Sequence, residues 1–300
     1  MSPICRFRSL RSISITGVPV MSVLRRSARL VLRRNPRLPG IRPRLRRMRR
    51  GSSRTATGRA PDAKAPVGFF DSGLGGTCVL EAFRRLCPLE KTVYIADLRH
   101  CPYGNRSPEE IIRLSEANVK RLLRRNCKMI VVACNTATAA AIDYLRAKYP
   151  EVPFIGIEPA VKPAALRSKS GVVGVLATAG TFGGRLYKET KARFARNVTV
   201  IATVADEFVT EVEKARIPGS IAVDGRRLRS AAVERIVRAK IEPLLGAGAD
   251  KIVLGCTHFP HLKPVIEKVC AGRAEVIDPS DAVARQARRV LASRGLLAEA

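Results

Sequence analysis

The sequence lacks the features that mark several common protein classes. No two of its eight cysteines stand in a C-x-x-C spacing, which argues against a zinc-binding or thioredoxin-like motif. No apolar run approaches the roughly 20 residues that a membrane-spanning helix needs. No signal peptide with a clear apolar core is visible, and a chain of 300 residues does not depend on disulfides. We therefore expect a cytoplasmic protein with reduced thiols and no membrane partner.

Acidic residues are scarce at the start of the chain. The formal net charge is +30, and residues 1–66 hold seventeen Arg and one Lys against a single acid, Asp62. This leaves +13 of the total for the remaining 234 residues. An Arg-rich segment with Ser, Pro and Gly buries too little apolar surface to offset the entropy of ordering it. We therefore expect residues 1–66 to be a disordered N-terminal extension.

Three interpretations of this extension stay open. It is translated upstream sequence, with Met21 or Met48 as the later start, or a basic tail that contacts nucleic acid or anionic surfaces, or an organelle transit peptide rich in Arg and Ser. Only the second interpretation gives the protein a nucleic-acid partner, and it does so only through residues 1–66.

From Val67 onward, short β-branched runs alternate with amphipathic segments. Apolar runs too short for a helix are typical of parallel strands that are buried on both faces. We expect strands at residues 67–70, 91–96, 129–133, 154–157, 171–176, 198–201, 251–255 and 275–278. Ser107 and Pro108 are a good cap and first residue for one long helix, and another helix is expected over 229–245.

This alternation predicts an α/β protein with two pseudo-symmetric lobes, parallel-rich sheets and an active site in the cleft between the lobes. The first lobe is expected to comprise residues 67–163 and 267–300, because the last strand and helix should return to it. The second lobe is expected to comprise residues 164–266.

Two cysteines occupy matching places in the two halves. Cys134 follows the strand predicted at 129–133, and Cys256 follows the strand predicted at 251–255. Ligands in open α/β sheets bind just beyond the carboxyl ends of strands, so thiols placed there could face each other across a cleft. Such a pair suits an enzyme that takes a proton from one face of a carbon and returns one to the other face.

Four motifs occur in an order that resembles the glutamate racemases. They are Asp71-Ser72-Gly73-Leu74-Gly75-Gly76, Pro102-Tyr103-Gly104, Cys134-Asn135-Thr136-Ala137-Thr138 and Gly255-Cys256-Thr257-His258. The similarity runs from about Val67 to the C-terminal helix. It implies membership in the cofactor-independent aspartate/glutamate racemase superfamily and interconversion of L- and D-glutamate without pyridoxal phosphate or metal. Because the family supplies D-glutamate for peptidoglycan, a role in cell-wall synthesis is implied, and we expect a homodimer.

The resemblance also implies roles for individual residues. Cys134 would act on D-glutamate and Cys256 on L-glutamate, with Asp71 beside Cys134 as a proton relay or an orienter of the substrate amine. His258 and Glu213 would support the second thiol. The substrate-binding residues would be Ser72, Pro102, Tyr103, Gly104, Asn135, Thr136 and Thr257.

The chemistry of racemisation explains the use of such a pair of thiols. The Cα proton of an amino acid is very weakly acidic, so its removal without an electron sink needs a base placed against it and donors directed at the carboxylate. A thiol with an ordinary pKa of about 8.5 is mostly protonated at neutral pH, so one site can hold thiol while the other holds thiolate. One cysteine then accepts a proton while the other donates one.

Several of these residues also have purely structural explanations. Asp71 or Ser72 could cap the helix that follows them. The residues after each thiol could likewise cap the helix that begins there. His258 could be a helix-start residue that the backbone satisfies. Glu213 could be a solvated helix charge, in a stretch where three polar residues stand in place of the family's usual prolines and apolar residues.

Neither a nucleotide loop nor a metal site is complete in the sequence. The glycines of residues 73–76 lack the G-x-G-x-x-G spacing, and no Walker lysine follows them. Cys256, His258 and His261 are close together, but no carboxylate or second thiol completes a metal site at that spacing. Cys101 is expected near the mouth of the cleft without a role.

Other functions stay open beside glutamate racemisation. A sister racemase would act on aspartate or a hydantoin, although Thr138 and His258 favour glutamate. A basic nucleic-acid-binding protein could use the lobes as a scaffold. A cysteine hydrolase would need a histidine partner for Cys134, which the neighbouring sequence does not offer.

Overall fold

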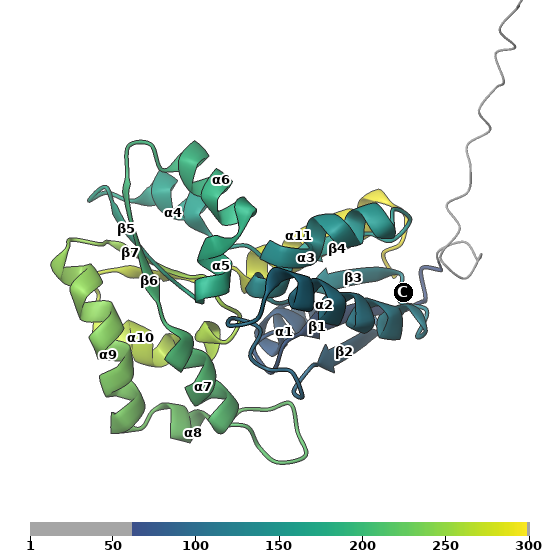
Figure 1. Ribbon diagram of the computed structural model, residues 1–300, viewed down its shortest axis with the longest axis horizontal. Coiled ribbons are helices and arrows are strands. Elements are labelled where there is room, and N and C mark those ends of the chain that lie inside the picture. The colour runs from purple at the N-terminus through teal and green to yellow at the C-terminus, as the bar shows by residue number, and fades with distance from the viewer. Residues whose placement is uncertain (1–61, 299–300) are drawn as a thin grey trace, which may run out of the picture. The chain divides into compact units, whose positions relative to one another are not determined.

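The computed structural model describes residues 62–298, in which strands and helices alternate (Figure 1). The strands are β1 Val67–Asp71, β2 Thr92–Ala96, β3 Met129–Val132, β4 Phe154–Gly156, β5 Val172–Ala177, β6 Thr199–Val204, β7 Lys251–Leu254 and β8 Glu275–Ile277. The helices are α1 Thr77–Leu86, α2 Pro108–Leu123, α3 Asn135–Lys148, α4 Val161–Arg167, α5 Ala179–Gly183, α6 Arg185–Phe194, α7 Asp206–Lys214, α8 Gly225–Leu228, α9 Ala231–Gly246, α10 Lys263–Cys270 and α11 Ser280–Ser293, with the 3₁₀ helix η1 Phe259–Leu262. The expected disordered extension lies outside the described residues, apart from residues 62–66.

The strands form two four-stranded sheets with the same internal order. The first sheet runs β2-β1-β3-β4 and the second runs β6-β5-β7-β8, and every pairing is parallel. The predicted α/β class and the predicted repetition of one lobe by the other are therefore confirmed.

Burial on both faces explains why the strands are short apolar runs. In the first sheet, Phe69 and Val131 belong to the core on one face, whereas Phe70, Ile130 and Val132 belong to the core on the other. Successive side chains of a strand point to opposite faces, so both faces must be apolar when helices cover both. Helix α2 begins as predicted, because the Ser107 side chain accepts a hydrogen bond from the Glu110 backbone N–H at 3.2 Å.

The second sheet is built in the same way. Ile252 and Leu254 of β7 pack with α9 and α10, while Val253 between them packs against α4 on the other face. The expected helix over 229–245 is present as α9, displaced by one or two residues.

The predicted boundaries between the lobes are wrong at two places. The strand near the C-terminus, β8, pairs with β7 in the second sheet, with Ile252 opposite Val276, whereas we had expected it in the first lobe. Helix α4 packs wholly on the second sheet through Val161 and Ala164, so a boundary at residue 163 would divide it. A short apolar strand is equally suited to either sheet, and its local sequence does not determine the strand with which it pairs.

Only the last helix, α11, returns to the first lobe. Its residues Val283, Ala287 and Leu291 pack in one core with Phe83 of α1, and Figure 1 shows α11 in yellow beside the first sheet. The chain therefore crosses between the lobes twice, after β4 and after β8.

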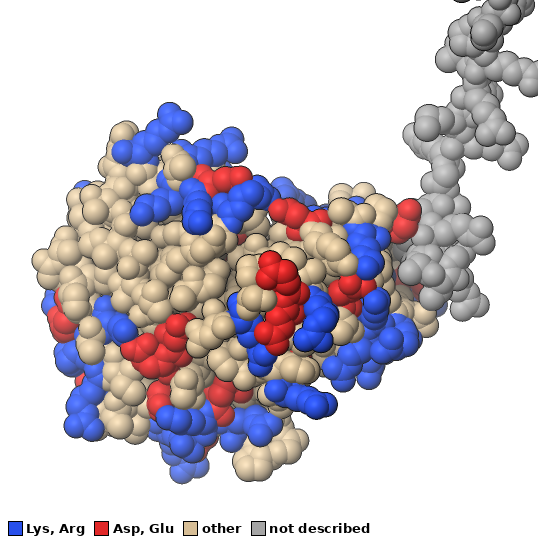
Figure 2. Space-filling model, viewed as in Figure 1, with Lys and Arg blue, Asp and Glu red and all other residues tan. Residues whose placement is uncertain are grey.

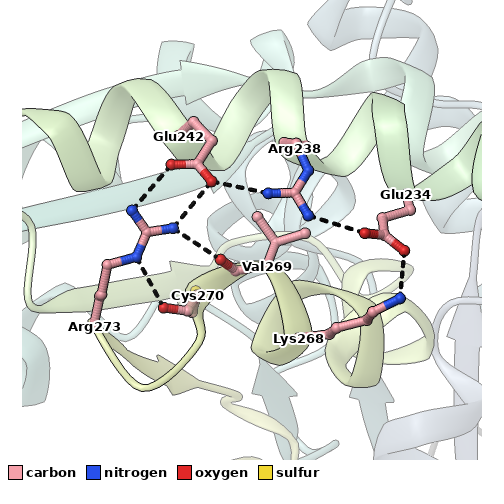
Figure 3. A network of polar contacts seen from close by, with 7 residues as sticks. All are labelled: Glu234, Arg238, Glu242, Lys268, Val269, Cys270 and Arg273. Atoms are coloured by element: carbon pink, nitrogen blue, oxygen red, sulfur yellow. Dashed lines mark hydrogen bonds and ion pairs between the residues drawn. The ribbon is translucent and has the colours of Figure 1, made fainter.

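Charged side chains join α9 to α10 on the surface of the second lobe. Arg238 contacts Glu234 at 2.9 Å and Glu242 at 3.1 Å, Lys268 contacts Glu234 at 2.7 Å, and Arg273 contacts Glu242 at 3.0 Å (Figure 3). Exposed pairs of this kind contribute only about 0.2–1 kcal/mol each. The network is consistent with α10 belonging to the second lobe rather than the first.

Surface charge is mixed over the described residues. Acidic side chains lie among the basic ones on the face drawn in Figure 2. Within residues 62–298, no helix is both long enough and apolar enough to cross a membrane.

Candidate active site

The predicted site residues stand at the carboxyl ends of strands in both sheets. Asp71 ends β1, Cys134 follows β3 by two residues and Cys256 follows β7 by two residues. All three side chains are buried. In a parallel sheet these strand ends share one edge, which is where open α/β folds bind their ligands.

Hydrogen bonds join the two lobes at these edges. Thr257 donates from Oγ1 to Oδ2 of Asp71 at 3.0 Å, and the hydroxyls of Thr136 and Thr178 lie 3.0 Å apart. The backbone N–H of Leu74 donates to Oε1 of Glu213 at 2.8 Å. The groups beside both thiols therefore meet in one buried place, although they come from distant parts of the chain.

Cys134 caps the N-terminus of α3. Its Sγ accepts a hydrogen bond from the Ala137 backbone N–H at 3.5 Å and lies 3.8 Å from Oγ of Ser72. A helix N-terminus favours negative charge on sulfur. Burial acts the other way and raises the pKa of Cys134, and the Asp71 carboxylate raises it further. The first site therefore favours the protonated thiol.

Cys256 has different neighbours. Its Sγ lies 3.7 Å from Nδ1 of His258, and Nε2 of the same ring lies 2.7 Å from Oε1 of Glu213. Burial alone lowers the pKa of His258, but hydrogen bonds to Cys101, Cys256 and Glu213 outweigh it and raise the pKa well above the ordinary value. The second thiol therefore has a charged hydrogen-bond partner, which the first thiol lacks within the described residues.

The partner of this histidine carries the matching charge. Burial raises the pKa of Glu213, yet the hydrogen bond and the charge of His258 prevail and lower it overall. Glu213 also accepts the hydrogen bond from Leu74, so the interpretation of this residue as a solvated helix charge is wrong. His258 and Glu213 therefore form an ion pair, and the imidazole of this pair contacts the second thiol.

Asp71 receives hydrogen bonds from both lobes. Its Oδ1 accepts a hydrogen bond from the Gly73 backbone N–H at 2.7 Å, while Oδ2 accepts the one from Thr257. Burial raises the pKa of Asp71, partly offset by the charge of His258. The interpretation of Asp71 or Ser72 as a helix cap is wrong, because α1 begins at Thr77 and no side chain caps it.

The glycine-rich turn after β1 allows the lobes to approach each other. A Cβ atom on Gly73 would stand 2.0 Å from Oε1 of Glu213, and one on Gly75 would stand 2.5 Å from Nδ1 of His258. Both distances are far below van der Waals contact, and a Cβ on Gly75 would also stand 2.6 Å from the backbone nitrogen of His258. The motif is therefore explained by close packing of the two lobes rather than by a nucleotide phosphate.

The predicted substrate-binding residues fall into two groups. Ser72, Asn135, Thr136 and Thr257 are buried beside the thiols. Asn135 donates from Nδ2 to the Ile157 carbonyl at 3.5 Å, and its buried Oδ1 has no hydrogen-bond partner within residues 62–298. This oxygen is an acceptor available to a bound molecule.

The loop of Pro102, Tyr103 and Gly104 lies at the side of the site. The Tyr103 hydroxyl donates to Oδ2 of Asp97 at 2.6 Å and accepts from Nδ2 of Asn118 at 3.3 Å, so it holds the loop in place. A Cβ on Gly104 would stand 3.3 Å from Cβ of Thr178, so the loop packs closely on the second lobe.

Sequence reasoning missed three residues that the fold brings to the site. Thr178 follows β5 as Ser72 follows β1, so the repeated architecture could have indicated it. His261 contacts the Thr77 hydroxyl at 3.2 Å and the Cys78 thiol at 3.4 Å. Cys101 was expected to have no role, yet its Sγ lies within 4.8 Å of donor atoms of both Glu213 and His258. No local sequence pattern indicates these last contacts.

Comparison with known proteins agrees with this geometry. The family model for Asp/Glu/Hydantoin racemase matches residues 77–287. A glutamate racemase of Roseiflexus sp. is 43% identical over 77% of this chain and 81% of its own length.

Two solved structures are also similar. The glutamate racemase isoform RacE1 from Bacillus anthracis has a TM-score of 0.67 and 30% identity, covering 78% of this chain and 84% of that one. The Escherichia coli glutamate racemase was solved with L-glutamate and the activator UDP-MurNAc-Ala. It has a TM-score of 0.64 and 34% identity, and the match covers 76% of this chain and 82% of that one. With its parallel sheets, its paired strand-end thiols and these relatives, the chain belongs to the Asp/Glu/Hydantoin racemase family.

Proposed function

We propose that this protein is a glutamate racemase that interconverts L- and D-glutamate through Cys134 and Cys256, without a cofactor. The observation that carries the proposal is the unlike surroundings of two thiols at equivalent strand ends. Cys134 is buried at a helix N-terminus with a raised pKa, and Cys256 stands beside the His258–Glu213 pair. One thiol is suited to donate a proton and the other to accept one.

In the L-to-D direction, the Cys256 thiolate takes the Cα proton of L-glutamate and becomes a thiol. The electron pair left on Cα is delocalised into the substrate carboxylate. The Cys134 thiol then gives its proton to the opposite face of Cα and becomes a thiolate. The reverse reaction exchanges the two roles, and proton exchange with solvent restores the starting state.

Donors around the site stabilise the charge that develops on the carboxylate. The N-terminus of α3 presents backbone N–H groups, and Ser72 and Thr136 present hydroxyls. The free Oδ1 of Asn135 is suited to accept a hydrogen bond from the substrate ammonium group. Thr257 gives its hydroxyl proton to Asp71, so its Oγ1 is suited to accept a hydrogen bond from the same ammonium group.

The wider setting is part of the same proposal. D-Glutamate made here enters peptidoglycan, in the cytoplasm, and the enzyme works as a homodimer. The seven cysteines within residues 62–298 are all free, and a mechanism built on thiols requires a reducing compartment. Any contact with nucleic acid is assigned to residues 1–66, where the excess of arginine is greatest. A salt-titrated DNA-binding assay on the full chain and on one starting at Ala65 tests this: equal binding by both would move the contact into the lobes.

The test of the activity is a circular-dichroism assay of purified protein with L-glutamate, D-glutamate or L-aspartate and no added cofactor. We expect racemisation of both glutamate enantiomers and a lower kcat/KM for aspartate. Cys134→Ala and Cys256→Ala should each lower kcat by about 10²–10⁴-fold, the usual effect of losing a positioned acid or base. Cys87→Ala, a buried thiol at the far end of α1, is the matched control. If aspartate were turned over as efficiently as glutamate, the assignment of glutamate as the preferred substrate would be wrong. Full activity in either alanine variant would remove that thiol from the mechanism.

A further inference from the structure

Three metal-ligating side chains converge beside the second thiol. Cys101 in the loop after β2, Glu213 in α7 and His258 after β7 each offer one donor atom, and these atoms all lie within 4.8 Å of one another. Thiolate, carboxylate and imidazole are the three ligand types that zinc binds in proteins. Three protein ligands leave a fourth position for water, as in open zinc sites.

The cluster is reached from a surface cavity. A cavity of about 370 Å³ is lined by Cys101, Pro102 and Glu213, among others. Cys101 and Glu213 are partly exposed, whereas His258 is only 2% exposed. Two basic residues, Lys214 and Arg216, also line the cavity. Lys214 is paired with Glu211 at 2.8 Å, and Arg216 is exposed to solvent. A small cation can therefore reach the three ligands from the side of Cys101.

A glycine leaves room for the ligands to meet. A Cβ atom on Gly73 would stand 2.8 Å from Sγ of Cys101 and 2.0 Å from Oε1 of Glu213. Any other residue at this position would displace both donor atoms. The close approach of the lobes at Gly73 is thus what brings the thiol of one lobe to the carboxylate and imidazole of the other.

We propose that Cys101, Glu213 and His258 form a binding site for a thiophilic divalent cation such as Zn²⁺, and that occupancy of this site blocks the second thiol. Binding replaces the proton of the Cys101 thiol and the proton shared by His258 and Glu213, and these protons leave to solvent. The metal then holds the imidazole and the carboxylate that support Cys256. The inhibition, unlike the binding, rests on the proposed function.

The binding is tested without any activity assay. Full-length protein, stripped of metal by chelation, is titrated with Co²⁺ while the thiolate-to-cobalt charge-transfer absorption is recorded. We expect one equivalent of Co²⁺ to produce this absorption and Zn²⁺ to remove it. Cys101→Ala should weaken binding by at least about tenfold, because losing even an outer partner of a ligand costs 10–100-fold.

Two further variants make the result specific. Cys87→Ala should bind Co²⁺ like the unaltered protein, because this thiol is remote from the cluster. Cys101→His keeps a ligand at the position and should bind Co²⁺ without the thiolate absorption. Far-ultraviolet circular dichroism confirms that each variant is folded. Absence of the absorption in the unaltered protein, or its full retention in Cys101→Ala, would overturn the proposal, the latter because another thiol would then be the ligand.

The inhibitory effect has its own readout. Stoichiometric Zn²⁺ should lower the initial racemisation rate of the unaltered protein and of Cys87→Ala, and Cys101→Ala should need at least tenfold more Zn²⁺ for the same loss. Equal sensitivity of Cys101→Ala would overturn the inhibitory part. A complete lack of racemisation before metal is added would count against the proposed function, while the cobalt titration would still decide the metal site.

Discussion

Thr257 donates a hydrogen bond of 3.0 Å from Oγ1 to Oδ2 of Asp71, and this bond joins the residue after the second thiol to the last residue of β1. Both side chains are buried. The bond therefore couples the two halves of the site directly, and within residues 62–298 it is one of two hydrogen bonds that the buried carboxylate accepts.

Thr257→Val tests the value of this bond. Valine has nearly the shape of threonine but no donor, so Asp71 loses a partner in a buried place, which costs about 1–3 kcal/mol. We expect urea unfolding to show this loss, and kcat/KM for glutamate to fall because the Asp71 carboxylate is no longer held in place. The measurement is a steady-state circular-dichroism assay in both directions. Thr257→Ser keeps the donor and should retain most of the activity, and an equal loss in both variants would assign the effect to packing instead.

His258→Asn should affect the two directions of racemisation unequally. It removes the protonated imidazole beside Cys256, the thiol that acts on L-glutamate under the proposed function. We expect kcat to fall more with L-glutamate than with D-glutamate. The equilibrium constant between the enantiomers is one, so kcat/KM must stay equal in the two directions. The ratio of KM for L-glutamate to KM for D-glutamate must therefore fall by the same factor as the ratio of the two kcat values. Equal losses of kcat would show that the histidine serves both thiols alike.

The pair of His258 and Glu213 should make stability depend on pH in a defined window. The pKa of His258 is raised in the folded state, so its contribution is complete below about 6.5 and is lost as the pH rises through the raised value. The pKa of Glu213 is lowered, so its contribution is complete above about 4.5 and is lost as the pH falls through the lowered value.

The unaltered protein should therefore have a higher free energy of unfolding than His258→Gln, and the difference should be largest between about pH 4.5 and 6.5. Urea unfolding of both proteins at a series of pH values measures this difference. It should shrink toward alkaline pH as the imidazole loses its proton. A difference that grows with pH would mean that the histidine is buried in its neutral form.

A second ion pair, remote from the site, supports the first lobe. Nζ of Lys128 lies 2.7 Å from Oε2 of Glu90, with side chains 0% and 2% exposed, and Oε1 of Glu90 accepts a hydrogen bond from the Ala298 backbone N–H. Lys128→Met would leave a buried carboxylate without its cation, which costs about 3–5 kcal/mol. Urea unfolding should show this loss. Glu90→Gln combined with Lys128→Met should recover part of it, and no recovery would show that packing of the lysine stem, not its charge, is what matters.

The sequence predicted the parts of this fold that local patterns encode. Runs such as Met129-Ile130-Val131-Val132 are buried strands, and Ser107 with Pro108 begins α2, because burial on both faces and helix capping leave local signatures. The partner of β8 was wrong, since a short apolar run does not record which sheet it joins. Boundaries between the lobes depend on such pairings.

The candidate site divides in the same way. The thiols and their neighbours stand at strand ends and could be predicted from their position. The contact of Cys101 with Glu213 and His258 could not, because it joins residues more than a hundred positions apart. Such contacts depend on how closely the two lobes approach at Gly73, and only the folded structure gives that distance.

The account rests on two separate proton carriers, one for each face of Cα. The most direct test is to incubate the enzyme with L-glutamate in heavy water and to measure deuterium at Cα in both enantiomers before a tenth of the substrate, roughly, has reacted. We predict that the D-glutamate formed carries deuterium while the remaining L-glutamate does not, because the proton returned comes from Cys134 and not from Cys256. Equal early deuteration of both enantiomers would contradict the account, because a single base would then be removing and returning the proton.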